Sequence, residues 1–279
     1  MKAPSGTLYV VATPLGNLGD LTLRATELLR RVPLVVAEDT RRTRPLLAHL
    51  DAHPRLLSFH AHSDAARLQD ILDRLATGED VALVSDAGTP VISDPGVDLI
   101  ARARAAGIPV VPIPGPSAVA TALSAAGISG DRYLFLGFPP RKGKERARWL
   151  ERALAEPFTV VCFEAPGRTG ELLGDLAEHD PDRTAVVARE LTKLHEEFVA
   201  GTLGELAAKY RETAPRGEVT IVMTGRGERE SVLAQIDVES RAAELLGAGR
   251  SPRTVVTQLV DETGLPKNQV YRVVMKLAR

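Results

Sequence analysis

Short runs of β-branched and aliphatic residues alternate with longer segments in which apolar residues recur at helical spacing. This alternation is typical of a mostly parallel sheet whose strands are joined by crossover helices. In the first half of the chain it predicts strands at residues 8–12, 34–37, 56–59, 81–84 and 110–113. Helices are expected at 21–30, 65–76 and 97–106, and a further helix at 118–126 ends at Gly127. We therefore expect an N-terminal α/β domain over residues 1–127.

The same alternation continues beyond Gly127. It predicts strands at residues 133–136, 159–163, 184–188, 197–200 and 219–223, with helices at 145–155, 169–178 and 203–212. We expect a second α/β domain over residues 128–230, again with a mostly parallel sheet and with a ligand cleft between the two domains.

Strand signals stop after Gly225-Arg226-Gly227. A helix is predicted up to a break at Gly247-Ala248-Gly249, followed by helices at residues 251–262 and 266–277, with Pro252 and Pro266 at helix-first positions and a turn at Gly264-Leu265. This spacing suits a helix-turn-helix, so residues 231–279 are expected to form a helical tail.

Composition narrows the class of protein. The 279 residues are 44% hydrophobic and 25% charged, as in ordinary globular proteins, and the net charge is −1. Nucleic-acid binding would therefore depend on local basic patches. A single cysteine, Cys162, excludes an intrachain disulfide, and the histidines lack paired metal-ligand spacing. Because the histidines lack such spacing, we expect no bound metal. Because no apolar run approaches a membrane span and the first residues do not resemble a signal peptide, we expect a cytoplasmic protein.

Loops rich in glycine and proline follow three strands of the predicted first domain. They cover residues 13–20, 85–96 and 114–118. In open parallel sheets, ligands bind at the carboxyl ends of the strands, and such loops present backbone N–H and C=O groups there. No dinucleotide or phosphate-loop glycine motif occurs in the chain, which argues against NAD and ATP. The alternatives are tight turns and an interdomain hinge.

Charged residues stand at the end of other predicted strands. The segment 38–43 combines Glu38 and Asp39 with Arg41 and Arg42. It is interpreted either as a helix start capped by Asp39 or Thr40, or as bases and phosphate-binding cations near the cleft. Segments 163–168 and 189–196 of the second domain would form the opposite wall, or a solvated face.

Basic residues gather in two places outside these loops. Residues 140–148 carry five cations, among them Arg141 and Lys142, against one carboxylate. From Arg241 to Arg279 there are seven Lys or Arg against three acidic residues. Both are candidate RNA-backbone contacts, although residues 140–148 also fit a solvated loop that leads into an amphipathic helix.

Six ordered motifs identify the chain as similar to the tetrapyrrole-methylase superfamily, and within it to the branch that modifies ribosomal RNA. They are Thr13-Pro14-Leu15-Gly16-Asn17-Leu18-Gly19-Asp20, Ala37-Glu38-Asp39-Thr40-Arg41, Val84-Ser85-Asp86-Ala87-Gly88-Thr89-Pro90, Pro114-Gly115-Pro116-Ser117-Ala118, Phe163-Glu164-Ala165-Pro166 and Arg189-Glu190-Leu191-Thr192-Lys193. Where porphyrin-modifying relatives have a Gly-Asp-Pro loop, this chain has Ser85-Asp86-Ala87-Gly88, which matches the rRNA branch.

The resemblance implies that S-adenosylmethionine (S-adenosyl-L-methionine) is held between the domains, mostly by main-chain groups. By resemblance, the cofactor contacts are Pro14, Asp86, Ala87, Gly88, Val91, Ser117, Ala118, Thr121, Phe163, Leu194 and Thr220. It also implies a homodimer, and the helix-turn-helix tail resembles the extra module of the rRNA branch.

The activity implied is 2′-O-methylation of a cytidine ribose in the decoding region of 16S rRNA, within the small ribosomal subunit. Asp39 and Glu38 are the candidate general bases. The candidates for binding substrate phosphates are Arg41, Arg42, Arg189 and Lys193. Two alternatives remain: a tetrapyrrole methyltransferase of the same fold, and a non-enzymatic nucleic-acid-binding protein whose cleft senses a ligand.

Overall fold

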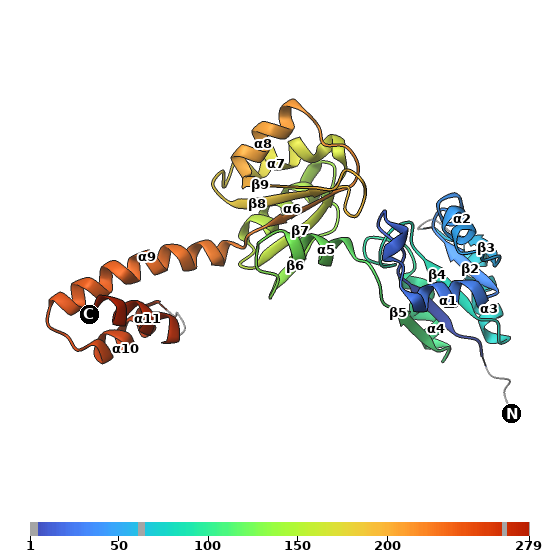
Figure 1. Cartoon of the computed structure of the whole chain (residues 1–279), viewed down its shortest axis with the longest axis horizontal. Helices are drawn as coiled ribbons and strands as arrows, with labels where there is room; N and C mark the ends of the chain where they lie inside the picture. The colour runs from blue at the N-terminus through green and yellow to red at the C-terminus, as the bar shows by residue number, and fades with distance from the viewer. Residues whose placement is uncertain (1–4, 61–64, 264–266, 279) are drawn as a thin grey trace.

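The computed structural model describes residues 5–60, 65–263 and 267–278, which form two α/β domains and a helical tail (Figure 1). The predicted turn at Gly264-Leu265 and the helix-first Pro266 lie outside the described residues. All ten predicted strands are present, and their bounds differ from the prediction by at most a few residues.

The first sheet is parallel throughout. Its strands are β1 (Leu8–Val11), β2 (Leu34–Ala37), β3 (Arg55–Ser58), β4 (Val81–Val84) and β5 (Val110–Ile113), in the order β3-β2-β4-β1-β5. The parallel sheet predicted for this domain is confirmed. Because the strands are parallel, the loops after β1, β2, β4 and β5 all leave from one edge of the sheet.

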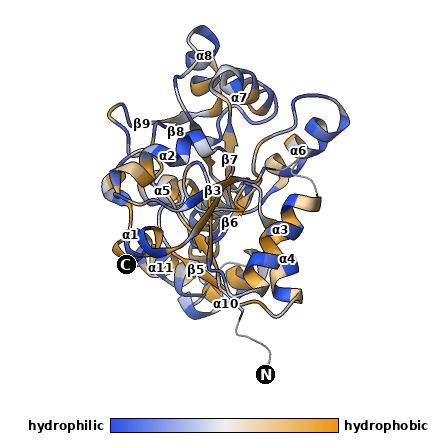
Figure 2. Ribbon diagram, turned by 90° about the vertical axis from the view of Figure 1, so that its right-hand side faces the viewer, coloured by the Kyte–Doolittle hydropathy of each residue, from blue (hydrophilic) through white to orange (hydrophobic). Residues whose placement is uncertain are grey.

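Helices cover both faces of this sheet. They are α1 (Leu23–Arg31) and α2 (Thr40–His49) on one face, and α3 (Ala65–Ala76) and α4 (Val97–Ala105) on the other. Each helix buries an apolar stripe and leaves a polar face to solvent, which the banded colouring of α3 and α4 shows in Figure 2. Alternate strand residues therefore belong to different cores, as with Val35 and Val36.

The second sheet contains β6 (Tyr133–Phe135), β7 (Thr159–Glu164), β8 (Thr184–Arg189), β9 (Glu197–Thr202) and β10 (Val219–Met223), in the order β6-β7-β10-β8-β9. Only β6 and β7 pair in parallel; the pairs β7–β10, β10–β8 and β8–β9 are antiparallel. The expectation of a mostly parallel second sheet is therefore wrong. An apolar run buried on both faces looks the same in either direction, so the pattern could not reveal that β10 inserts between β7 and β8.

Helices α6 (Gly143–Ala155), α7 (Thr169–Ala177) and α8 (Leu203–Glu212) pack on one face of the second sheet. The other face is covered by α5 (Ala118–Ala125), whose Val119 and Ala122 contact Val161 and Val222. The boundary after residue 127 stays a prediction. The packing of α5 favours a boundary in Pro114-Gly115-Pro116, ahead of this helix.

The tail consists of α9 (Arg226–Gly247), α10 (Pro252–Thr263) and α11 (Lys267–Leu277). It has an apolar core of its own, which includes Val238, Val255 and Val270. Figure 1 shows α9 extending away from the second domain and carrying the two shorter helices. Within the part of the chain that the structure describes, no helix is both long and apolar enough to cross a membrane.

Gly96 positions the loop that joins β4 to α4. It has a φ of +126°, and a Cβ at this position would lie 2.7 Å from Cδ2 of Leu83 in the core. We expect Gly96→Ala to lower the free energy of unfolding by about 1–3 kcal/mol, measured by chemical denaturation, because only glycine adopts this conformation without strain. Gly174→Ala in α7, where the Cβ would meet nothing, is the control and should be neutral or stabilising. Equal effects of the two substitutions would contradict this account of Gly96.

Candidate functional site

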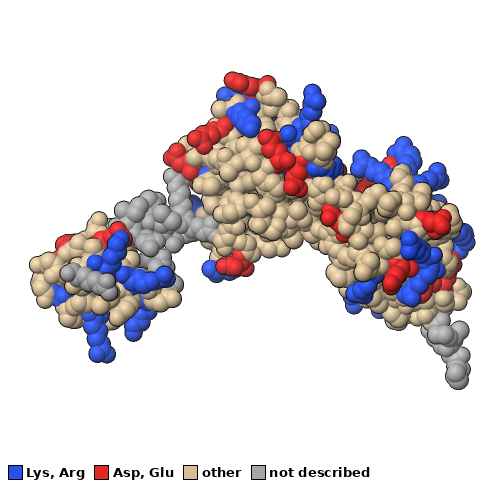
Figure 3. Space-filling model, viewed as in Figure 1, with Lys and Arg blue, Asp and Glu red and all other residues tan. Residues whose placement is uncertain are grey.

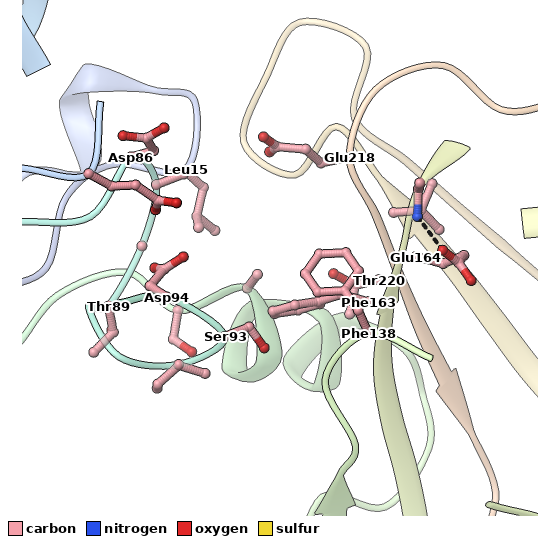
Figure 4. Close-up of a pocket in the computed structure, with 18 of the residues that line it drawn as sticks. Leu15, Asp86, Thr89, Ser93, Asp94, Phe138, Phe163, Glu164, Glu218 and Thr220 are labelled. Carbon is pink, nitrogen blue, oxygen red and sulfur yellow. Dashed lines mark hydrogen bonds between the residues drawn. The ribbon is translucent and has the colours of Figure 1, made fainter. Parts of the chain in front are cut away.

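A cavity of about 320 Å³ lies between the two α/β domains. The first domain lines it with the loops after β1, β2, β4 and β5, and the second with the ends of β7 and β10 and the segment after β6. In Figure 4, Asp86 and Asp94 stand on one side, opposite Phe138, Phe163 and Thr220 on the other. The cavity therefore combines a polar wall with an apolar wall.

Backbone hydrogen bonds hold the glycine-rich loop after β4 in place. Thr13 and Gly88 form an isolated antiparallel bridge, with N···O distances of 2.9 and 3.0 Å. The Ser85 hydroxyl donates to the Gly88 carbonyl at 2.8 Å, and the Thr89 hydroxyl donates to the Pro116 carbonyl at 2.9 Å. Gly88 has a φ of +81°, which a side chain would strain. The three loops rich in glycine and proline thus form one connected wall.

The second half of the same loop is strained. Val91 and Ser93 both have a φ of +66°, although neither is a glycine. Such conformations cost about 1–3 kcal/mol each and occur mainly where function requires them. Here they precede Asp94, which the loop turns into the cavity (Figure 4).

Aromatic rings form much of the opposite wall. The Phe163 ring packs edge-on against Phe138, with centroids 5.5 Å apart, and against Phe135 at 4.8 Å. Phe138 is 53% exposed although it is a large apolar side chain. Thr220 lies beside these rings with its hydroxyl-bearing side chain buried. An apolar surface with few polar groups suits a flat heterocyclic ligand.

Three carboxylates face the cavity from the first domain: Glu38, Asp86 and Asp94. Burial, followed by repulsion from Glu38 and Asp86, raises the pKa of Asp94 to about 7. Burial and the charge of Asp86 also raise the pKa of Glu38. Asp86 itself accepts a hydrogen bond from the Asp39 N–H at 3.0 Å and pairs with Arg42 at 3.5 Å. Among the described residues, no group of three or more side chains is placed to hold a metal ion.

Asp39 has a different environment. It caps α2 by accepting the Arg41 N–H at 2.9 Å, and its carboxylate also pairs with the Arg41 guanidinium at 2.7 Å. The hydrogen bonds from Arg41 lower the pKa of Asp39 to about 2, and the residue lies outside the cavity lining. The helix-cap interpretation of this segment is confirmed. An ion-paired carboxylate with so low a pKa is a poor proton acceptor. The assignment of Asp39 and Glu38 as general bases stays a prediction.

The loop after β1 in the first domain contacts the loop after β8 in the second domain. The Asn17 N–H donates to the Thr192 hydroxyl at 3.1 Å. The Lys193 stem covers Gly16, where a Cβ would lie 2.2 Å from Cγ of the lysine. The Lys193 ammonium pairs with Glu190 at 2.9 Å and with Glu218 at 3.3 Å. Lys193 is therefore held by carboxylates, and its stem closes a contact between the domains.

Seven predicted cofactor residues line the cavity: Asp86, Ala87, Gly88, Ser117, Ala118, Phe163 and Thr220. Pro14, Val91, Thr121 and Leu194 lie outside its lining, and Leu194 is 93% exposed. The assignment of all eleven residues as cofactor contacts stays a prediction.

The predicted substrate cations are dispersed. Of Arg41 and Arg42, which lie in α2, only Arg42 lines the cavity; Arg189 pairs with Glu197, and Arg141 and Lys142 are exposed just before α6. Figure 3 shows Lys and Arg atoms gathered over α2 and on the tail helices.

The sequence analysis did not select Asp94, Phe138 or Glu218, which also line the cavity. The only available signal for Asp94 was its place in the unusually long loop at residues 85–96. Phe138 and Glu218 carry no motif, and only the folded arrangement brings them to the cleft.

Known proteins similar to this chain match it over nearly its whole length. Residues 7–207 match the model of the family described as Tetrapyrrole (Corrin/Porphyrin) Methylases. A protein named Ribosomal RNA small subunit methyltransferase I from Micromonospora olivasterospora is 44% identical, over 98% of this chain and 88% of that protein. Proteins of the same name are 41% identical in Synechocystis sp., covering 98% of both chains, and 45% identical in Xylella fastidiosa, covering 97% and 99%.

Solved structures share the two-domain fold at lower identity. Diphthine synthase has a TM-score of 0.62 at 15% identity, over 79% of this chain and 90% of its own. Uroporphyrin-III C-methyl transferase from Thermus thermophilus, complexed with S-adenyl homocysteine, has a TM-score of 0.55 at 20% identity, over 80% and 99%. These likenesses concern the fold.

The raised pKa of Asp94 makes a prediction about stability. Because the folded chain holds this proton more tightly than the unfolded chain, stability should fall as pH rises from about 4 to about 7. Asp94→Asn removes this loss, so its Tm should exceed that of the parent chain at pH 8, and the gap should narrow at pH 4. Asp131→Asn, at an exposed residue just before β6, is the control and should show no such dependence. A pH-independent Tm difference for Asp94→Asn would contradict the raised pKa.

Proposed function

Because the chain belongs to the tetrapyrrole (corrin/porphyrin) methylase family, we propose that it is an S-adenosylmethionine-dependent methyltransferase that acts on RNA of the small ribosomal subunit. The observation that supports this most strongly is the 37–45% identity to proteins named Ribosomal RNA small subunit methyltransferase I, over nearly the whole chain. These relatives extend through the helical tail, beyond the part of the chain that the family model matches.

The residues of the cavity fit the cofactor. The Phe138 and Phe163 rings offer a surface for a flat purine, and the loops around Gly88 and Ser117 bring backbone groups to its other side. The carboxylates of Asp86 and Glu38 suit the hydroxyl and ammonium groups of such a ligand. When bound, the cofactor supplies a methyl group from a positively charged sulfur, which keeps the electron pair of the broken bond.

For the acceptor, we propose the ribose 2′-oxygen of a cytidine in the decoding region of 16S rRNA. The chain's own part is to orient that hydroxyl and to receive its proton. Orientation can be worth about 7–11 kcal/mol of the barrier, whereas a general base typically adds about 10²–10⁴-fold in rate. The two rigid walls of the cleft are suited to the larger of these contributions.

A tetrapyrrole substrate is the second candidate, and the shared fold with uroporphyrin-III C-methyl transferase favours it. Two features favour RNA instead. The basic tail is a separate module outside the two α/β domains, and α2 places Arg42 at the cavity. Family membership also supports a cytoplasmic homodimer.

The test of the proposed function is methyl transfer to RNA. We expect the full chain to transfer label from methyl-tritiated S-adenosylmethionine to small ribosomal subunits purified from cells that lack this modification. Mass spectrometry of the digested RNA should locate the methyl group on the ribose of one cytidine. Methylation of a base would refute 2′-O chemistry, and transfer only to uroporphyrinogen would establish the second candidate.

The tail gives a separate prediction about RNA affinity. Arg272 and Lys276 are exposed on α11, near no cavity residue. Reversing both charges to glutamate should weaken binding to small subunits and lower the slope of log affinity against log salt by about 1 per cation. Binding of S-adenosylhomocysteine, followed by calorimetry, should not change. Reversal of Arg211, an exposed cation of α8, is the control. If the tail variant and the control bind subunits equally, α11 does not contact RNA.

A further inference from the structure

A second cavity, of about 390 Å³, adjoins the first on the α3 and α4 side of the N-terminal domain. Its lining includes His60, Val97, Asp98 and Arg102, together with Pro95 and Gly96 at the start of α4. Its size lies within the range of cavities that hold small ligands. Neither the family resemblance nor any role assigned above accounts for it.

Asp94 is the side chain that lines both cavities. The strained residues Val91 and Ser93 come just before it in the chain, and the positive φ of Gly96 comes just after it. This loop therefore fixes Asp94 at the place where the two cavities adjoin. A methyl transfer between two bound molecules requires adjoining sites, because donor and acceptor atoms must come within about 3–3.5 Å of each other.

The lining of the second cavity has the chemistry of a nucleotide site. His60 is an exposed ring on which a base can stack, and Arg102 is an exposed guanidinium that can pair with a backbone phosphate. Val97 is 62% exposed at the first position of α4, where no described side chain caps the helix. Backbone N–H groups at such a helix start favour anionic or hydroxyl oxygens.

We propose that this second cavity receives the target nucleotide, and that Asp94 is the catalytic residue that accepts the proton of its 2′-hydroxyl. The inference rests on the proposed function and specifies the acceptor site. The 2′-oxygen forms its bond to the methyl carbon as its O–H bond breaks, and the proton moves to a carboxylate oxygen of Asp94. Asp94 then returns this proton to water.

The groups around Asp94 set the pH at which it can accept a proton. Glu38, Asp86 and Glu218 repel its negative charge, and the Ser85 hydroxyl stabilises it by a hydrogen bond. His60, Asp98 and Arg102 line the second cavity together with Asp94. Since burial and the acidic neighbours raise its pKa to about 7, Asp94 ionises near neutral pH. Asp39, with a pKa of about 2, has far less tendency to take up a proton.

The first experiment blocks the second cavity. Val97→Trp in the full chain should raise KM for unmodified small subunits by about tenfold or more, and should weaken binding of cytidine 5′-monophosphate to the cofactor-free protein. Affinity for S-adenosylhomocysteine should stay within about twofold. Leu23→Trp, at a site that is 82% exposed on α1, is the matched control and should change none of the three. An unchanged KM and nucleotide affinity in Val97→Trp would overturn the proposed acceptor site.

The second experiment tests Asp94. Asp94→Asn should lower kcat by about 10²–10⁴-fold while affinity for S-adenosylhomocysteine is retained. In the parent chain kcat should rise with pH through about 7, and this inflection should disappear in Asp94→Asn. Asp51→Asn is the control for the same chemical change at an exposed site. An Asp94→Asn variant with the kcat and pH profile of the parent would overturn the role of Asp94.

These outcomes are distinguishable from failure of the proposed function. If the parent chain methylates small subunits but the two variants behave like their controls, the enzyme class stands and the acceptor site is elsewhere. If the parent chain binds S-adenosylhomocysteine but transfers no methyl group to any subunit RNA, the proposed function fails, and this inference fails with it.

Discussion

The apolar contact between the two domains is the constraint on which the candidate site depends. Leu15, in the loop after β1 of the first domain, packs into the apolar cluster in which Val119 and Ala122 of α5 meet Val161 and Val222 of the second sheet. Burial of this kind contributes about 25 cal/mol per Å² of apolar surface and has no direction of its own. The hydrogen bond from Asn17 to Thr192 and the packing of the Lys193 stem over Gly16 are specific contacts that orient the two domains relative to each other. The cleft consequently lies between two walls that are joined by these contacts.

The pKa values of the carboxylates in the cleft depend on their burial and on how close together they lie. Glu38 comes from the loop after β2, whereas Asp86 and Asp94 come from the loop after β4, and they meet because these parallel strands end at one edge of the sheet. Burial of Asp94, followed by repulsion from Glu38 and Asp86, raises the pKa of Asp94, whereas hydrogen bonds from Arg41 lower the pKa of Asp39. Asp94 and Asp39, which both follow strands at this edge of the sheet, thus have pKa values shifted in opposite directions. The strained residues Val91 and Ser93 come just before Asp94, which lines both cavities.

Acidic and basic side chains gather in different parts of the molecule, although the net charge of the chain is close to zero. The chain as a whole carries −1, and the cavity has three carboxylates on its first-domain wall. Cations lie instead over α2 and on the tail, which has its own core and extends from the second domain on α9 (Figure 3). A polyanion would thus be held by surfaces around the cleft, while the interior of the cleft is suited to a cationic or neutral group.

The sequence by itself determined the elements and the family. All ten strands, nearly all the helices and the three glycine- and proline-rich loops could be predicted, because their signals are periodicity and turn chemistry within short windows. Seven of the eleven residues that the sequence analysis selected as cofactor contacts line the cavity.

Tertiary structure decided the rest. The position of β10 between β7 and β8 depends on hydrogen bonds between distant segments, which a buried apolar run does not specify. The contrast between Asp39 and Asp94 likewise depends on partners far apart in sequence, such as Asp86 beside the Asp39 N–H. A proton affinity is set by burial and by neighbouring charges, and these exist only once the chain has folded.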